Sequence, residues 1–270
     1  MTENSNEDVN NEFYEEAREI LNEPVSTRAQ KEFNKELEYS ITKARTAKLD
    51  NEPILGNYDK DHLSKIHEAL FRRLYDYAGK FRDFNISKLC VNPENADFEI
   101  GHFLESEKID ENLAKFSEKI NNLNRLKGLN KDQFIENFTI YFAELNEIHP
   151  FQEGNGRATK VLMRQLANDA GYEIHYDKVK SNEWNYACKR SLSDQKVYVE
   201  HPVDPKPNTQ DFTLLKNVFS NIIEPLLKPD QNLAISAFAQ GIKNRSSFVL
   251  KKEKDNEQNL DDDSNTPSFF

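Results

Sequence analysis

Apolar residues recur every three or four positions along most of this chain, which is the spacing of one buried face of an α-helix. The pattern, with its capping, glycine and proline stops, predicts helices at 59–79, 109–128, 130–148 and 157–171, and two more at about 181–192 and 209–227. The segment 81–91 differs, because Phe84 and Ile86 alternate with polar residues there, and it predicts a short exposed hairpin. The expected fold class is therefore all-α, a helical bundle with a small β-hairpin.

Charge is concentrated at the two ends of the chain. The formal net charge is −11, of which residues 1–24 carry −7 and residues 251–270 carry −3. This acidity argues against a general nucleic-acid binder, which needs a basic surface for phosphates. We expect an acidic N-terminal extension (1–25), a main domain (26–205), a C-terminal helical extension (206–250) and an acidic tail (251–270), with both acidic ends solvated or disordered.

The remaining composition bears on the compartment. Two cysteines, Cys90 and Cys188, are too few for a disulfide framework and indicate a reducing environment. The sequence lacks a run of 18 apolar residues, and its first residues lack the basic and apolar regions of a secretion signal. We therefore expect a soluble, cytoplasmic protein with no membrane partner. Export by a dedicated secretion system would leave no trace in these residues.

The residues with the richest chemistry lie together between two strongly apolar helices, in the sequence HPFQEGNGRATK at 149–160. Pro150 ends the preceding helix, and Gly154 and Gly156 let the backbone turn tightly and approach a ligand. The next helix begins at about Arg157, so the unpaired N–H groups of its first turn face the loop. Such a helix start favours an anion.

Each charged side chain of this segment suits a nucleotide. Arg157 and Lys160 are three residues apart on one helix face and can hold phosphate oxygens. Glu153 is a hard oxygen ligand for Mg²⁺, and His149 has an ordinary pKa of about 6.5, which suits a general base. A zinc site is rejected, because proline and glycine interrupt the helix and no second His or Cys lies nearby. The segment predicts a phosphoryl- or nucleotidyl-transfer site.

HPFQEGNGRATK closely resembles the signature HPFx[D/E]GNGRxxR of the Fic (filamentation induced by cAMP) domain family, and supporting resemblance covers about residues 30–200. The layout is similar to that of bacterial FicT toxins and of the Fic domains of Bartonella type IV effectors. The resemblance implies a Fic-type helical bundle whose hairpin is a flap. It also implies a protein adenylyltransferase that moves AMP from ATP to a Ser, Thr or Tyr hydroxyl of a target protein and releases pyrophosphate.

The resemblance assigns roles to matching residues. His149 corresponds to the base, Glu153 to the Mg²⁺ ligand and Asn155 to the residue that holds the α-phosphate. The implied catalytic residues are His149, Asn155 and Arg157. The implied nucleotide-binding residues are Gly154, Asn155, Gly156, Arg157, Lys160, Ser87 and Lys88. The flap at Phe81–Val91 is expected to bind the target protein.

Two features depart from the family pattern. Lys160 replaces the terminal arginine of the signature, which keeps the charge but loses the planar fork of a guanidinium. The family's inhibitory motif, [S/T]xxxE[G/N], has no match here; Ser220 and Glu224 give a near miss that ends in proline. Inhibition is thus expected from a separate small antitoxin-like protein. Two alternative functions stay open: a Fic variant that uses another nucleotide or a phosphocholine donor, and an inactive nucleotide-binding module.

Overall fold

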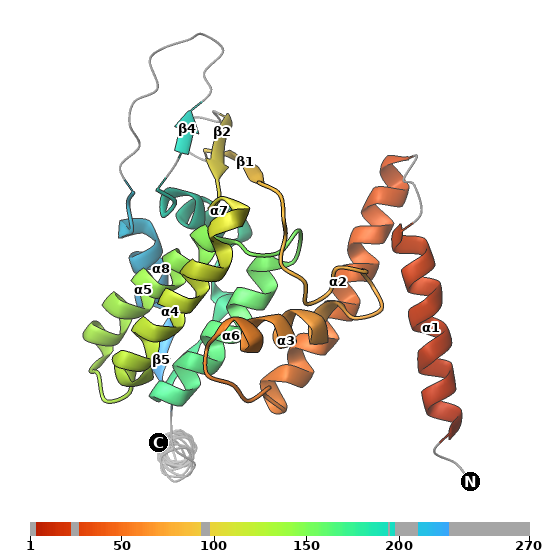
Figure 1. The fold of residues 1–270 in the computed structure, drawn as a ribbon, viewed down its shortest axis with the longest axis horizontal. Helices are drawn as coiled ribbons and strands as arrows, with labels where there is room; N and C mark the ends of the chain where they lie inside the picture. Colours follow the sequence, from red (N-terminus) through yellow and green to blue (C-terminus); the bar gives the residue numbers. More distant parts are fainter. Residues whose placement is uncertain (1–3, 23–26, 93–97, 194, 198–209, 227–270) are drawn as a thin grey trace, which may run out of the picture. The chain divides into compact units, whose positions relative to one another are not determined.

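Helices form most of the structure, a computed structural model that describes residues 4–22, 27–92, 98–193, 195–197 and 210–226. All elements described here belong to one unit, Met1–Pro225. In chain order the α-helices of these residues are α1 (Asn4–Asn22), α2 (Arg28–Asn51), α3 (Lys60–Phe71), α4 (Ile109–Asn122), α5 (Lys131–Ile148), α6 (Asn155–Ala170), α7 (Ser181–Arg190) and α8 (Thr213–Ile222) (Figure 1). Three single 3₁₀ turns follow the same order, η1 (Ser106–Lys108), η2 (Asn124–Leu126) and η3 (Tyr176–Lys178).

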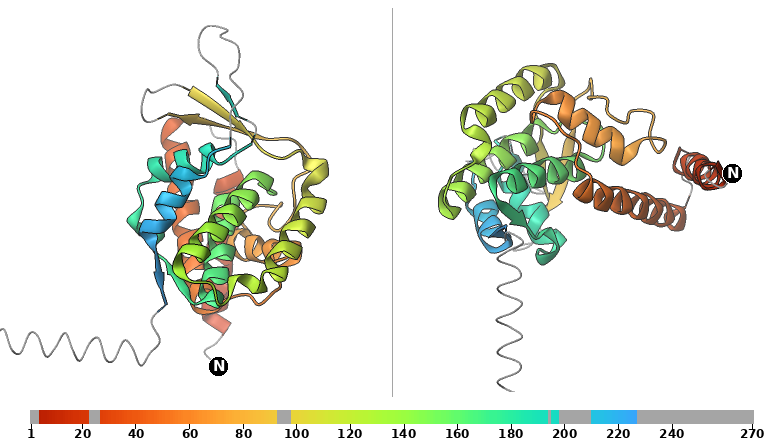
Figure 2. Two further views of the ribbon diagram at one scale, coloured as in Figure 1. Left: turned by 90° about the vertical axis from the view of Figure 1, so that its left-hand side faces the viewer. Right: turned by 90° about the horizontal axis from the view of Figure 1, so that it is seen from below.

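The strands of the described residues form two small antiparallel sheets. In the first sheet, of order β1-β2-β4, β1 (Ser87–Val91) pairs with β2 (Phe98–His102), and β2 pairs with β4 (Gln195–Val197). The second sheet joins β3 (Tyr172–Ile174) to β5 (Ile223–Pro225). The three-stranded sheet lies across one end of the helices (Figure 2, left). The all-α bundle with a small hairpin, as expected from the sequence, is confirmed.

Local capping explains where the main helices begin and end. The carboxylate of Asp59 accepts the N–H of His62 at 2.9 Å at the start of α3. A reciprocal capping box between Asn130 and Gln133 starts α5. At the end of α6, Gly171 adopts a φ of 90°, which a glycine tolerates without strain.

The core is centred on α5. This helix packs against α4, α6 and α8, and the edges of Phe138 and Phe142 meet the ring of Phe219 on α8. α6 lies between α5 and α3 and contacts both. Because α5 and α6 are both fixed by the core, the loop between them is held at both ends.

Four boundary predictions need correction. The helix expected at 109–128 ends at Asn122, because the backbone at Asn124–Leu126 takes positive φ angles. The hairpin does not lie within 81–91: β1 covers 87–91, and its partner β2 follows at 98–102. The helix expected at 59–79 ends at Phe71; turns follow as far as Gly79, and irregular chain leads from there to the hairpin. The helix expected at 209–227 ends at Ile222, because Pro225 has no N–H for a helical hydrogen bond and favours an extended backbone at Glu224 before it.

The acidic N-terminal segment was expected to be solvated or disordered, but it forms α1. Ala17 is 2% exposed and packs with Ile41 of α2 and Leu74, with Tyr14 and Leu21 beside them. Tyr14, Ala17 and Leu21 are spaced as one helix face, so a short apolar stripe outweighs the acidic composition. The tail at 251–270 and most of the expected extension at 206–250 lie outside the described residues.

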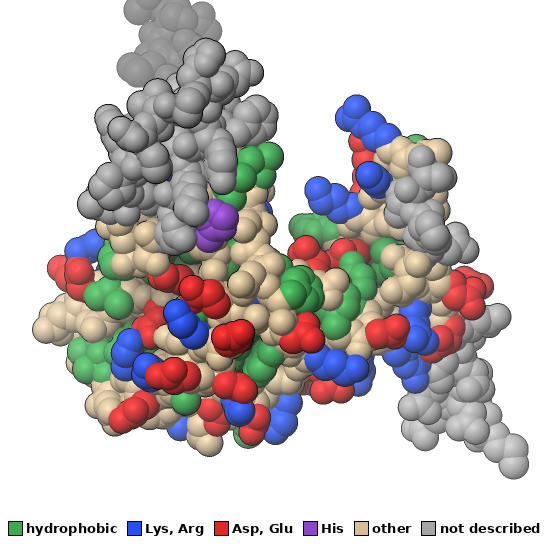
Figure 3. All heavy atoms as spheres, turned by 45° about the horizontal axis from the view of Figure 1, so that its top comes forward, with side chains coloured by type: hydrophobic (Ala, Val, Ile, Leu, Met, Phe, Trp, Pro, Cys, Tyr) green, Lys and Arg blue, Asp and Glu red, His purple; other side chains and the backbone are tan. Residues whose placement is uncertain are grey.

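Charged side chains of both signs are interspersed over the face of the helical body in Figure 3. This agrees with the near-neutral charge of the chain between its acidic ends. Of the helices described, none combines the length and the apolar character that crossing a bilayer requires.

Candidate functional site

The loop between α5 and α6 is fixed by its own side chains. Asn155 accepts the backbone N–H of Phe151 at 2.7 Å and donates to the same residue's carbonyl at 2.6 Å. Phe151 is fully buried, and its ring stacks on His67 of α3 at 3.8 Å between centroids. One amide hydrogen of Asn155 thus serves the loop, so a contact with an α-phosphate would use the second.

His67, which the sequence analysis did not assign to the site, supports the loop from below. Its Nδ1 accepts the N–H of Gly79 at 2.9 Å, so its Nε2 carries the proton and donates to the carbonyl of Glu153 at 2.9 Å. Burial lowers the pKa of His67 to about 4. The ring is therefore neutral at pH 7 and locked in one tautomer.

The two glycines of the loop have different tasks. Gly154 has a φ of 80°, and a Cβ there would lie 2.4 Å from the ring of Phe71. A Cβ on Gly156 would meet no described protein atom within 4 Å, yet Gly156 lines the pocket. Gly154 is needed by the fold, whereas Gly156 keeps space open for a ligand.

His149 ends α5 in a left-handed conformation, with φ 43° and ψ 60°. Its Nδ1 lies 3.1 Å from the carbonyl oxygen of Asn146, which can only accept, so Nδ1 carries the proton and Nε2 is left as a proton acceptor. The ring stacks on Phe103, just after β2, at 3.6 Å between centroids. Burial lowers the pKa of His149 to about 3, which keeps the ring neutral at pH 7.

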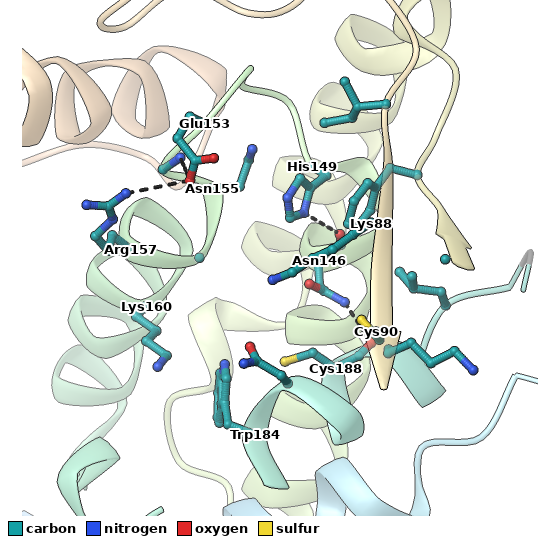
Figure 4. Close-up of a pocket in the computed structure, with 18 of the residues that line it drawn as sticks. Lys88, Cys90, Asn146, His149, Glu153, Asn155, Arg157, Lys160, Trp184 and Cys188 are labelled. Carbon is teal, nitrogen blue, oxygen red and sulfur yellow. Dashed lines mark hydrogen bonds and ion pairs between the residues drawn. The ribbon is translucent and has the colours of Figure 1, made fainter. Parts of the chain in front are cut away.

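His149 and the start of α6 face one pocket of about 720 Å³. β1, α2 and α7 supply its other walls (Figure 4). In the described structure the N–H groups of Asn155 and Gly156, at the start of α6, have no protein partner, and the first turn carries no acidic residue. An anion placed there meets unpaired donors and the positive end of the helix dipole.

Arg157 points toward α2. Its guanidinium forms an ion pair with Glu38, donates to the hydroxyl of Thr42 at 3.2 Å and lies 4.6 Å from the ring of Phe71. Tyr75 donates its hydroxyl to the other oxygen of Glu38 at 2.7 Å, which holds that carboxylate in place. Phosphates that reach Arg157 must displace this ion pair.

Lys160 points elsewhere, although it was expected to act together with Arg157. Its ammonium lies 4.3 Å from the ring of Trp184 on α7 (Figure 4) and 5.1 Å from that of Tyr176 in η3, whose ring contacts Trp184. Burial lowers the pKa of Lys160. The two cations leave the same helix face in different directions: Arg157 points toward α2, and Lys160 points toward the rings of Trp184 and Tyr176.

The hairpin residues also reach the pocket. Ser87 and Lys88 of β1 line it, and the hydroxyl of Ser87 is 2.8 Å from Nδ1 of His102. Cys90 and Cys188 line the same pocket as free thiols. Burial raises the pKa of both thiols, so they stay protonated at pH 7.

Glu153 is the carboxylate of the motif that could hold a metal ion. Its carboxylate lines the pocket with 62% of the side chain exposed, and its Oε1 accepts the N–H of Gly154 at 2.9 Å. The same oxygen lies 3.6 Å from the guanidinium of Arg157 (Figure 4). In the described part of the chain no group of three or more His, Cys, Asp or Glu side chains could hold an ion. A single carboxylate suits Mg²⁺, which retains waters and takes its other ligands from phosphates.

The near miss to the inhibitory motif does not reach the site. Glu224 is in β5, where it forms an ion pair with Lys178 at 2.8 Å. The carboxylate that contacts the motif comes instead from Glu38, in the sequence Asn34-Lys-Glu-Leu-Glu38-Tyr39, which lacks both the Ser or Thr and the Gly or Asn of the pattern. A search of the sequence for the inhibitory motif therefore could not identify Glu38.

Residues 57–167 match the model of the Fic/DOC family. The chain is 34% identical over 155 residues to the protein adenylyltransferase VbhT of Bartonella schoenbuchensis, covering 57% of this chain and 30% of that relative. It is 30% identical over 149 residues to the probable protein adenylyltransferase Fic of Salmonella typhimurium, covering 55% and 68%. This chain therefore spans about a third of the first relative and two thirds of the second.

The fold also matches solved structures. The BepC protein of Bartonella tribocorum, a VirB-translocated effector solved with bound AMPPNP, superposes with a TM-score of 0.57 at 24% identity. The match covers 70% of this chain and 86% of that chain. At this identity the likeness establishes the fold.

Proposed function

Because this chain belongs to the Fic/DOC family, we propose that it is a protein adenylyltransferase. It transfers AMP from ATP to a Ser, Thr or Tyr hydroxyl of a target protein and releases pyrophosphate. The observation that carries the proposal is the placement of a neutral His149, with Nε2 free of a proton, beside the open N-terminus of α6 in one pocket.

His149 begins the reaction as general base. Nε2 takes the proton of the target hydroxyl while the hydroxyl oxygen attacks the α-phosphorus of ATP, and the bond between that phosphorus and the oxygen bridging to the β-phosphate breaks. Nδ1 keeps its proton and donates it in a hydrogen bond to the carbonyl of Asn146, which keeps the ring oriented. The histidine accepts a proton and makes no covalent bond to phosphorus.

The start of α6 holds the triphosphate. The N–H groups of Asn155 and Gly156 stabilise the negative charge that develops on the α-phosphate oxygens. Arg157 contributes charge to the outer phosphates once its ion pair with Glu38 opens. Glu153 would hold Mg²⁺, whose charge offsets that of the phosphates and of the departing pyrophosphate.

The target protein binds at the hairpin. β1 is the edge strand of its sheet, and in the described structure no strand pairs with its outer side. An extended target segment can add to that edge through backbone hydrogen bonds. Ile86, Ser87 and Lys88 line the pocket, so a segment on this edge lies next to the nucleotide.

Glu38 gives the chain a built-in competitor for the outer phosphates, because its carboxylate occupies Arg157 and repels a phosphate at the same position. We propose that activity requires α2 to release Arg157. A separate antitoxin-like protein stays an expectation from the resemblance, and it would act in addition to this contact.

The test is transfer of label from ATP labelled at the α-phosphate, with Mg²⁺ and bacterial or host-cell lysates. The wild-type protein is expected to label a target or itself, and His149→Ala is expected to abolish labelling while ATP still binds by calorimetry. Labelling that survives in His149→Ala would refute the role of the base. Parallel reactions with UTP, GTP and CDP-choline identify the donor, and ATP binding without transfer in any extract would favour an inactive binding module.

A further inference from the structure

Arg82 carries a buried guanidinium beside the motif loop that the reaction proposed above does not use. It lies in the connection between α3 and β1 and is 5% exposed. Among the described residues no carboxylate pairs with it. A buried cation is costly unless dipoles replace the water it has lost, so its hydrogen bonds identify what it holds.

One side of the guanidinium holds the turn that carries the base. Nε donates to the carbonyl of His149 at 2.9 Å, and Nη2 donates to that of Ile148 at 3.2 Å. The backbone N–H of Arg82 donates to the carbonyl of Pro150 at 2.9 Å. These acceptors lie at the end of α5, where carbonyls lack helical partners and the dipole is negative. Three consecutive residues are thus fixed by one arginine.

The other side of the guanidinium holds the hairpin. Nη1 donates to the carbonyl of Phe84 at 2.7 Å, and Nη2 donates to that of Leu104 at 2.5 Å. Phe84 precedes β1 and Leu104 follows β2, so the same group ties both ends of the hairpin. The N–H of Leu104 also donates to the carbonyl of Glu147 on α5 at 3.0 Å. The hairpin is therefore anchored to the helix that ends in the base.

The turn at His149 needs such support. Its left-handed backbone conformation costs roughly 1 kcal/mol or more for a residue with a side chain, so the surrounding structure must impose it. We propose that Arg82 is a positioning residue that holds His149 and both ends of the β1–β2 hairpin as one unit. The base and a target segment on β1 then keep a fixed relation. This proposal rests on the proposed transfer reaction.

Kinetics of Arg82→Gln and Arg82→Lys test the effect on the reaction. In Arg82→Gln we expect kcat/KM for the target to fall about 100-fold, the order of loss that a misplaced base produces. The KM for ATP should stay near the wild-type value, because Arg82 does not line the pocket. Arg82→Lys, which keeps the charge and some carbonyl contacts, should recover part of the loss.

The pH profile gives a second readout. The charge of Arg82 helps to lower the pKa of His149, so the acid limb of kcat/KM should move to higher pH in Arg82→Gln and less so in Arg82→Lys. The matched control is Arg45→Gln, since Arg45 likewise donates to carbonyls at a helix end, those of Leu70 and Arg72, away from the pocket. Arg45→Gln should lower the stability of the fold without shifting the pH dependence of kcat/KM.

Amide hydrogen exchange separates this proposal from the reaction on which it rests. In both Arg82 variants the amides of β1, β2 and residues 147–149 should exchange faster, while those of α4 and α5 before residue 145 stay protected. If the wild-type protein transferred no AMP, the proposed reaction would be refuted. The exchange pattern of the variants would still decide whether Arg82 holds His149 and the hairpin. Wild-type exchange and kinetics in Arg82→Gln, or loss of protection throughout the core in both variants, would overturn the proposal.

Discussion

The motif loop and α2 face the same pocket, but local contacts fix the position of the loop, whereas long-range contacts join α2 to the motif. The loop is fixed from within, by the amide of Asn155 on Phe151 and by His67 on the carbonyl of Glu153. α2 meets the motif through an ion pair from Glu38 and a hydroxyl from Thr42. The geometry of the loop is thus encoded in a short local segment, whereas the contacts of Arg157 depend on a helix that is distant in the sequence and that the motif does not specify.

The largest expected effect comes from Gly154→Ala. The substitution forces a side chain into a left-handed conformation and places Cβ 2.4 Å from the ring of Phe71. We expect a loss of about 2–4 kcal/mol in the free energy of unfolding, together with loss of transfer. Urea denaturation followed by circular dichroism measures it.

Gly156→Ala is the matched control, because its Cβ enters open space in the pocket. Stability should be unchanged or slightly raised, while ATP binding and transfer fall. If both variants lost stability equally, the two glycines would not have the separate tasks assigned to them.

On the loop side of the pocket, we expect His67 to make the stability of the fold depend on pH. The pKa of His67 in the folded protein, about 4, lies below that of an unfolded histidine, about 6.5, so between these values the unfolded chain binds the additional proton. Stability is therefore present above pH 6.5 and is lost as the pH falls toward 4, by about 3 kcal/mol from this group. Denaturation midpoints at several pH values measure the loss.

His67→Gln provides the control for this pH dependence, because an amide can accept from Gly79 and donate to Glu153 without titrating. The variant should show a shallower dependence, to which His149 still contributes with the same sign. An unchanged slope would mean that His67 is not the group that titrates.

On the α2 side, Glu38→Gln should raise activity. The substitution removes the charge that competes with phosphates for Arg157 but keeps an acceptor for the hydroxyl of Tyr75. We expect kcat/KM for ATP to rise about tenfold, equivalent to about 1.4 kcal/mol. Glu32→Gln, which loses an exposed ion pair with Arg28 on the same helix, should change nothing. Equal effects of the two variants would contradict the competition.

The last pair of variants separates the two cations of α6, and the smallest expected effect is that of Lys160→Met. Arg157→Met should raise the KM for ATP at least about tenfold, since it removes a charge from the phosphates. Lys160→Met, which replaces a cation packed against Trp184, should change that KM by less than about threefold. If Lys160→Met proved as damaging as Arg157→Met, both cations would hold phosphates, as the sequence suggests.

Sequence reasoning was strongest where local rules decide the structure. The helices around the motif follow from apolar spacing and from caps such as Asn130 and Gly171, and they formed as expected. The hairpin was misplaced because β2 lies beyond an intervening segment, so its pairing with β1 is not a local property. The helix α1 was missed because its apolar stripe is short and embedded in acidic residues.

The site divides in the same way. His149, Glu153 and Gly156 line one pocket with Ser87 and Lys88, and the roles proposed for them from the motif stay predictions. Glu38, Phe103 and Arg82 could not be inferred, because their contacts arise between segments far apart in the chain. The divergence of Arg157 and Lys160 depends on which side chains α2 and α7 bring to the pocket, which spacing on one helix does not reveal.

Intact-mass spectrometry of a labelled target protein, after incubation with ATP and Mg²⁺ and either the wild-type protein or His149→Ala, tests the central claim most directly. The account predicts that the wild-type protein adds one AMP group to a hydroxyl-bearing residue and that His149→Ala adds none. Addition of a phosphate group in place of AMP, or the same addition by both proteins, would contradict it.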